Sequence, residues 1–179
     1  MPVKFKILTL IYFLIFILPV STKAYSQTIA VFPVDDLSHE INSFNLLITR
    51  YLIYKLEAKG LNIVQEQEVF DFMSSRRINW LGYLDTENIL QTKETLGADL
   101  ILFGTMIIES KSSYGLILNM VRTKDAKTIW TSTSGLSLRD TQRLLRMNQP
   151  TMLEELWPIL INKAMKSWPA DLNKTLSEQ

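Results

Sequence analysis

The chain has 179 residues, of which 47% are hydrophobic and 21% charged, a balance typical of one globular domain and not of a disordered chain. Its formal net charge is +1, and without the three lysines that precede residue 27 it carries 16 basic against 18 acidic residues, so we expect no nucleic-acid partner. The sequence has no cysteine, which excludes disulfide bonds, thiolate metal sites and a lipid-modified N-terminal cysteine.

Residues 1–26 have the pattern of a secretory signal peptide. Two lysines precede an apolar run over 7–20, and Ala24 and Ser26 have the spacing that signal peptidase recognises. The alternative, an uncleaved membrane anchor, needs roughly 20 apolar residues. We expect cleavage before Gln27, with cleavage after Ala24 as second choice, and a soluble exported domain without a transmembrane span.

The next part of the chain predicts a strand, a turn and a helix. A β-branched apolar run over 28–34 predicts a buried first strand, and 35–38 a turn. Apolar residues four positions apart predict a helix over 43–59, with Ser43 as its cap and Gly60 just past its end. The expected inner face of this helix comprises Phe44, Leu47, Ile48, Tyr51, Leu52 and Leu56.

The middle of the chain predicts a short strand at 62–65 and two helices. The first helix runs over 66–76, with Val69, Phe70, Phe72 and Met73 as its inner face. The second is capped by Asp85 or Thr86, and Gly97 ends it. Between them, 78–84 is a loop rich in large apolar residues.

The rest of the chain predicts three strands and C-terminal helices. Residues 98–109 predict a central strand covered on both faces, and the alternation over 114–120 and 128–138 predicts two further strands, the last with one face in water. Asp140 caps a helical segment up to Gln149. Thr151 and Glu154 then form a capping box for a helix that Pro158 should kink. Residues 170–179 are expected to be a disordered tail.

These elements follow the order β-α-β-α-α-β-β-β-α over residues 27–169. The order predicts an α/β (α+β mixed) domain with a single mixed five-stranded sheet and helices packed on it. The first crossovers give parallel neighbours, and the last three strands form an antiparallel meander.

Three passages resemble a known group of envelope proteins. They are IAVFPVDDLS at 29–38, LGADLILFGT at 96–105 and KDAKTIW at 124–130. They are similar to the opening strand, a strand entry and the final hairpin of the domain shared by CsgG, LpoB, FlgO and the N-terminal domain of TolB. The resemblance covers about 110 residues. It implies an adapter or assembly factor of the cell envelope, with no catalysis and no cofactor.

Two departures from the family pattern modify that expectation. Lys127 stands where the family has a hairpin glycine, and the lipobox cysteine of CsgG and LpoB is missing. The second departure argues against lipid anchoring and favours a soluble periplasmic protein. No inserted segment is long enough for a pore-forming hairpin, which argues against a secretion channel.

Few residues are candidates for chemistry. His39 is the single histidine and lacks the partners of a triad or zinc site. Asp35 and Asp36 follow the predicted first strand, where open α/β sheets tend to bind ligands. They could hold a cation or small ligand, or one could accept turn amides while the other faces water.

The candidate partner-binding residues lie at the end of the second helix and in the loop behind it. Trp80, Leu81 and Tyr83 are exposed interface anchors or, alternatively, a satellite core. Arg76 and Arg77 could receive an anionic partner or complement the helix dipole. Trp130, Trp157 and Trp168 are expected in the core.

The sequence therefore predicts an exported, non-catalytic interaction module of an envelope assembly, in secretion, peptidoglycan synthesis, flagella or a Tol-like system. It would dock through the 80–84 loop or the exposed edge of the last strand. The expected partners are envelope proteins, and a homo-oligomer is an open alternative. The rival functions are a periplasmic small-ligand or cation-binding protein using Asp35 and Asp36, and an undetected envelope hydrolase.

Overall fold

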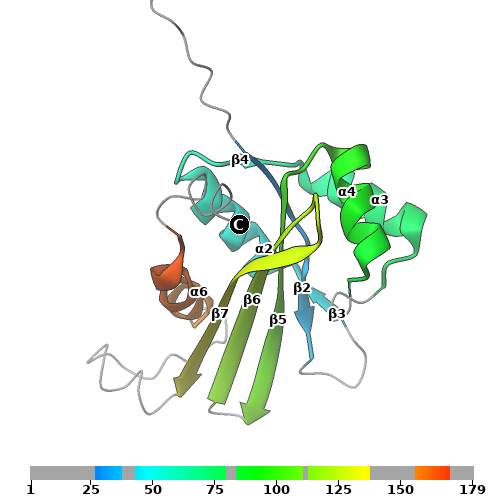
Figure 1. Cartoon of the computed structure of the whole chain (residues 1–179). Helices are drawn as coiled ribbons and strands as arrows, with labels where there is room; N and C mark the ends of the chain where they lie inside the picture. Colours follow the sequence, from blue (N-terminus) through cyan, green and yellow to red (C-terminus); the bar gives the residue numbers. More distant parts are fainter. Residues whose placement is uncertain (1–26, 38–42, 80–83, 111–112, 138–155, 170–179) are drawn as a thin grey trace, which may run out of the picture.

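The computed structural model describes residues 27–37, 43–79, 84–110, 113–137 and 156–169, and the strands of this part form one mixed sheet with helices packed on it (Figure 1). The strands are β1 (Thr28–Val31), β2 (Val34–Asp36), β3 (Ser43–Asn45), β4 (Asn62–Ile63), β5 (Leu100–Ser110), β6 (Ser113–Arg122) and β7 (Lys127–Ser137). The helices are α2 (Leu46–Glu57), α3 (Glu66–Arg76), α4 (Thr86–Leu96) and α6 (Trp157–Ala164), followed by a short 3-10 helix, η2 (Met165–Ser167). The predicted fold class is confirmed, and the sheet has two more short strands than expected.

The predicted first strand is split into β1 and β2, which lie end to end along β5. Both run parallel to β5, β1 beside its start and β2 further along. Pro33 has no N–H for the ladder, and the N–H of Val34 donates to Thr49 Oγ1 of α2 at 2.9 Å instead. The turn predicted over 35–38 is therefore wrong at its start, because the extended backbone continues to Asp36.

The predicted start of the first long helix is also wrong. Ser43 lies in β3, which pairs antiparallel with β2, so it does not cap a helix. The helix α2 begins after Asn45, whose Oδ1 accepts the N–H of Ile48 at 3.1 Å. Both residues favour an N-cap, so the sequence offered two starts, and pairing with β2 selects the later one. Gly60 has the expected left-handed backbone, with φ 77°.

The last three long strands form the predicted antiparallel meander. The strand β5 pairs with β6 over almost its whole length, and β6 pairs with β7. On the other side of β5, β1 leads to β4, and β2 leads to β3. The long strand β5 is thus the centre of the sheet.

Helices lie on both faces of the sheet. The inner face, as we name it, packs against α2 and α6 through a core that includes Leu52, Leu102, Leu118 and Leu160. The outer face packs against α3 and α4 through Val69, Phe72, Ile89 and Ile101, among others. Figure 1 shows α3 and α4 together on one side of the sheet and α6 beside β7.

The expected helix faces are mostly confirmed. On α2, Ile48, Leu52 and Leu56 are buried, but Leu47 is 60% exposed and Tyr51 is only partly buried. The stripe of α2 that contacts the sheet is narrower than the apolar stripe in its sequence. Leu47 and Tyr51 therefore lie outside the contact with the sheet. On α3, Val69, Phe72 and Met73 are buried, and Phe70 is partly buried.

The C-terminal helix α6 begins at Trp157, so Pro158 lies in its first turn. A proline there displaces no helical hydrogen bond, and the predicted kink at Pro158 is wrong. The segments predicted over 1–26, 140–149 and 170–179, the capping box at 151–154 and His39 lie outside the described residues.

Candidate interaction surface

Asp35 and Asp36 are buried, with 2% and 8% of their surface exposed. They are successive residues of β2, in register with Thr105 and Met106 of β5. Side chains alternate across a strand, so the two carboxyl groups point to opposite faces of the sheet. This geometry does not suit one cation held by both residues. Among the described residues, no group of three or more histidine, aspartate and glutamate side chains is placed to hold a metal ion.

The arginines at the end of α3 are described, whereas Trp80, Leu81 and Tyr83 lie outside the described residues. Arg76 forms an ion pair with Glu87 of α4 at 3.6 Å. Arg77 is the C-cap of α3 and is exposed, with a left-handed φ of 55°. The backbone role of Arg77 leaves its guanidinium group in solvent.

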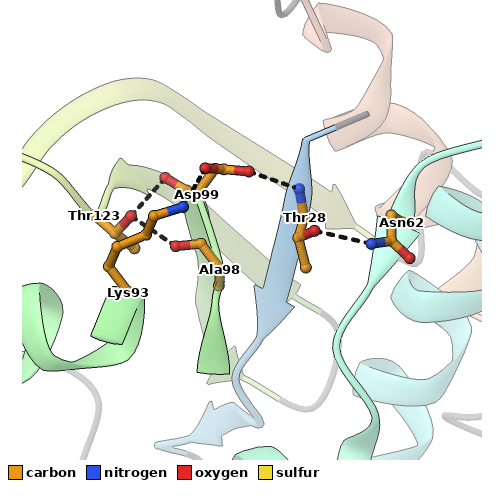
Figure 2. Close-up of polar contacts among 6 residues, drawn as sticks. All are labelled: Thr28, Asn62, Lys93, Ala98, Asp99 and Thr123. Carbon is orange, nitrogen blue, oxygen red and sulfur yellow. Dashed lines mark hydrogen bonds and ion pairs between the residues drawn. The ribbon is translucent and has the colours of Figure 1, made fainter. Parts of the chain in front are cut away.

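Asp99, from the LGAD passage, holds the amino-terminal edge of the sheet together (Figure 2). Its Oδ2 accepts the N–H of Thr28 at 3.0 Å, and its Oδ1 lies 2.6 Å from Lys93 Nζ of α4. The hydroxyl of Thr123 donates to the carbonyl oxygens of Ala98 and Asp99, both at 2.8 Å. This motif residue therefore connects β1, β5, α4 and the end of β6, which is a structural role.

The hairpin between β6 and β7 is fixed by a two-bond ion pair. Arg122 Nε and Nη2 donate to the two carboxylate oxygens of Asp125, at 2.9 and 2.6 Å. The hydrogen bond from Arg122 lowers the pKa of Asp125 to about 2. The residue with the left-handed backbone is Ala126, with φ 55°. Lys127, which stands where the family has a glycine, is the first residue of β7.

On the outer face of the three long strands lies a patch that the described helices do not bury. Three rows of residues in register cross β5, β6 and β7. We name these nine residues the open face: Phe103, Asn119 and Thr131; Thr105, Ile117 and Thr133; Ile107, Gly115 and Gly135. The described helices α3 and α4 bury the preceding pair, Ile101 and Val121, and Phe103 packs partly buried against the same core. None of the nine is buried, and Figure 1 shows no described helix over the lower parts of these strands.

The composition of the open face is unusual for a sheet surface in water. None of the nine residues is charged, and three of them are Phe103, Ile107 and Ile117. The three apolar side chains are partly buried and lie among three threonines, an asparagine and two glycines. A sheet surface in water normally carries charged residues as well, and depletion of charge is typical of the core of a protein interface. Our sequence prediction missed this surface, because it treated 98–109 as covered on both faces. The available signal was the lack of charge at three alternate positions on each of three successive strands: 103, 105 and 107; 115, 117 and 119; 131, 133 and 135.

The edge of β7 was the other predicted docking surface. Within the described residues β7 pairs only with β6, but α6 and η2 lie against it. Lys163 Nζ donates to the carbonyl oxygen of Gly135 at 2.8 Å, and Trp130 Nε1 donates to the carbonyl oxygen of Ser167 at 2.8 Å. These contacts occupy part of the space that an added strand would need.

No helix within the described residues is both long and apolar enough to span a membrane.

The structure resembles solved envelope proteins. No family model matches the sequence, and no curated protein does. The LpoB C-terminal domain from Salmonella enterica matches with a TM-score of 0.51 and 13% identity, over 63% of this chain and 83% of that one. Lipoprotein GNA1162 from Neisseria meningitidis matches with a TM-score of 0.50 and 12% identity, over 79% and 99%. The LpoB C-terminal domain from Escherichia coli gives 0.50 and 16%, over 63% and 83%.

These identities establish a shared fold and no more. The resemblance to LpoB expected from the sequence is supported at the level of fold. The comparisons do not show the likeness to CsgG, FlgO or TolB.

Proposed function

We propose that this chain is an exported, non-catalytic adapter that docks onto an envelope protein through the open face. The single observation that carries the proposal is the open face, nine uncharged residues in register on β5, β6 and β7 of which none is buried. The fold shared with the LpoB C-terminal domain and with a neisserial lipoprotein supports an envelope setting. The absence of cysteine favours a periplasmic form without a lipid anchor.

The surface also indicates the kind of partner. Because none of the nine residues carries charge, the partner should present an uncharged and largely apolar surface, since a charged group would lose hydration here without an opposite charge. The last row adds room for a side chain of the partner. A Cβ atom at Gly115 or Gly135 would meet nothing closer than 3.8 Å, so a partner can approach the backbone there.

The 80–84 loop, with Arg76 and Arg77 beside it, remains a second proposed contact. Exposed aromatic and arginine side chains are frequent anchors at interfaces. Replacement of Trp80 and Tyr83 by alanine tests this contact separately from the open face. Partner capture that is unchanged by both replacements would remove the loop from the proposal.

The experiment for the open face compares two lysine substitutions. Ile117→Lys places a charge in the middle row, whereas Tyr54→Lys changes an aromatic residue on α2 that is 62% exposed and lies on the other side of the sheet. Each full-length variant is exported, cross-linked in cells and purified, and the bound proteins are identified. We expect wild type and Tyr54→Lys to retain the same envelope partner and Ile117→Lys to lose at least nine tenths of it, roughly 1.4 kcal/mol or more in binding free energy.

Melting temperatures decide whether that loss is specific. Ile117 is only partly buried, so Ile117→Lys should melt close to wild type. Equal capture by a folded Ile117→Lys variant would contradict the proposal. Loss of the partner by Tyr54→Lys alone would place the interface on α2.

A further inference from the structure

Gln27 is the residue that directly precedes the sheet. The next residue, Thr28, starts β1, and its N–H donates to Asp99 Oδ2 at 3.0 Å (Figure 2). The hydroxyl of Thr28 also accepts a hydrogen bond from Asn62 Nδ2 at 2.8 Å. The folded domain therefore holds the chain at Thr28, one residue after Gln27. Signal peptidase is expected to cleave the bond before Gln27, which makes Gln27 the new N-terminus.

The side chain of Gln27 is poorly satisfied. Its Oε1 is buried and has no hydrogen-bond partner within the described part of the chain. A buried amide oxygen without a donor has lost its hydration and gained no hydrogen bond in return. Ring closure requires the carboxamide to turn toward the backbone nitrogen of its own residue, and no hydrogen bond from the described residues to Oε1 opposes that turn.

We propose that Gln27 becomes the mature N-terminus and is converted to pyroglutamate. The free α-amine attacks Cδ of its own carboxamide, a bond forms between this nitrogen and Cδ, and the Cδ–Nε2 bond breaks. The amine gives up a proton, and Nε2 leaves as ammonia. The reaction needs no oxidant, reductant or cofactor. It depends on cleavage before Gln27, and it is independent of partner docking at the open face.

The carboxylate that holds Thr28, the residue after Gln27, already has a second partner. The attacking amine must be unprotonated, and a free carboxylate close by would hold it as the ammonium ion. The carboxylate of Asp99 already has Lys93 Nζ at 2.6 Å and the N–H of Thr28 at 3.0 Å.

The test is the mass of the exported protein, measured without digestion and followed by sequencing of its N-terminal peptide. The full chain is expressed with its own signal and purified from the periplasm. We expect a chain that begins at residue 27, is lighter by one ammonia and has no reactive α-amine. The matched control is Gln27→Asn, whose α-amine could close only a strained four-membered ring and whose other nucleophile, the nitrogen of Thr28, is bound to Asp99. This variant should keep its full mass and its amine.

Three results would overturn the inference: a wild-type chain that begins with an open Gln27, one that begins at Tyr25, or one that retains residues 1–26. Partner capture through the open face is read from a different experiment, so the two proposals can fail independently.

Discussion

Gly104 lies on the inner face of β5, opposite Leu118 of β6. A Cβ atom at this position would lie 2.7 Å from Leu118 Cδ2 and 2.9 Å from the carbonyl oxygen of Ile117. The glycine of the LGADLILFGT passage is therefore needed for close packing and not for a turn. The sequence showed that the passage resembles a family motif, but it could not show this reason, because the contact depends on the register of β6.

We predict that Gly104→Ala lowers the free energy of unfolding by about 1–3 kcal/mol, since the added methyl group must displace a backbone oxygen or a buried leucine. Urea unfolding measures this change. Gly135→Ala is the control, because its nearest neighbour would be 3.8 Å away. Equal effects of the two substitutions would show that packing is not the cause.

Asp125 makes the stability depend on pH in a defined range. The hydrogen bond from Arg122 lowers its pKa from 3.8 to about 2 in the folded protein, so the unfolded chain binds more protons between these values. The contribution of Asp125 is complete above about pH 4 and is lost as the pH falls toward 2. We predict that Asp125→Asn is less stable than wild type at pH 6 and that the difference shrinks between pH 4 and pH 2. A constant difference across that range in thermal melts would contradict this assignment.

At the scale of elements, α6 is attached to β7 by two serine hydroxyls. Ser132 Oγ donates to the carbonyl oxygen of Ala164 at 2.8 Å, and Ser134 Oγ donates to that of Leu160 at 3.1 Å. Both serines are buried. The alternation of β7 was visible in the sequence. Serine is polar, however, and nothing local indicates that Ser132 and Ser134 are buried beneath α6.

We predict that the double variant Ser132→Ala, Ser134→Ala loosens α6. Each lost hydrogen bond should remove about 1 kcal/mol, and amide hydrogens of α6 should exchange faster while those of α3 do not change. Thr128→Ala, at an exposed position of β7, is the control. Unchanged exchange in α6 would mean that its apolar contacts alone hold the helix.

Helix ends and strand breaks differed in how well the sequence predicted them. The helix α4 was predicted almost to the residue, because Asp85 caps its start and Gly97, with φ 65°, ends it. The break between β1 and β2 was not predicted, because it depends on Thr49 of α2 accepting the N–H of Val34. Local signals fix an element where a cap or a glycine acts within a few residues, and they fail where the partner lies elsewhere in the fold.

At the scale of the whole molecule, the layers decide which apolar positions remain outside. Periodicity predicted the helices and the meander, but nothing local shows that α3 and α4 bury the rows of β5 and β6 only as far as Ile101 and Val121, with Phe103 partly buried beside them. The open face follows from this incomplete cover, and the exposed row on α2 from the narrow contact between α2 and the inner face. The sequence contains every residue of the open face, but it does not show how far the helices extend over the sheet. The candidate site was missed for that reason.

Site-specific photo-cross-linking in living cells tests the central claim most directly. A photoreactive residue at position 133, in the exposed middle row of the open face, is compared with one at position 54 on α2. The account predicts one discrete cross-linked envelope protein from position 133, absent from position 54 and competed away by excess wild-type chain but not by Ile117→Lys. A cross-link from position 54 alone, or one from position 133 that Ile117→Lys competes away as well as wild type does, would contradict it.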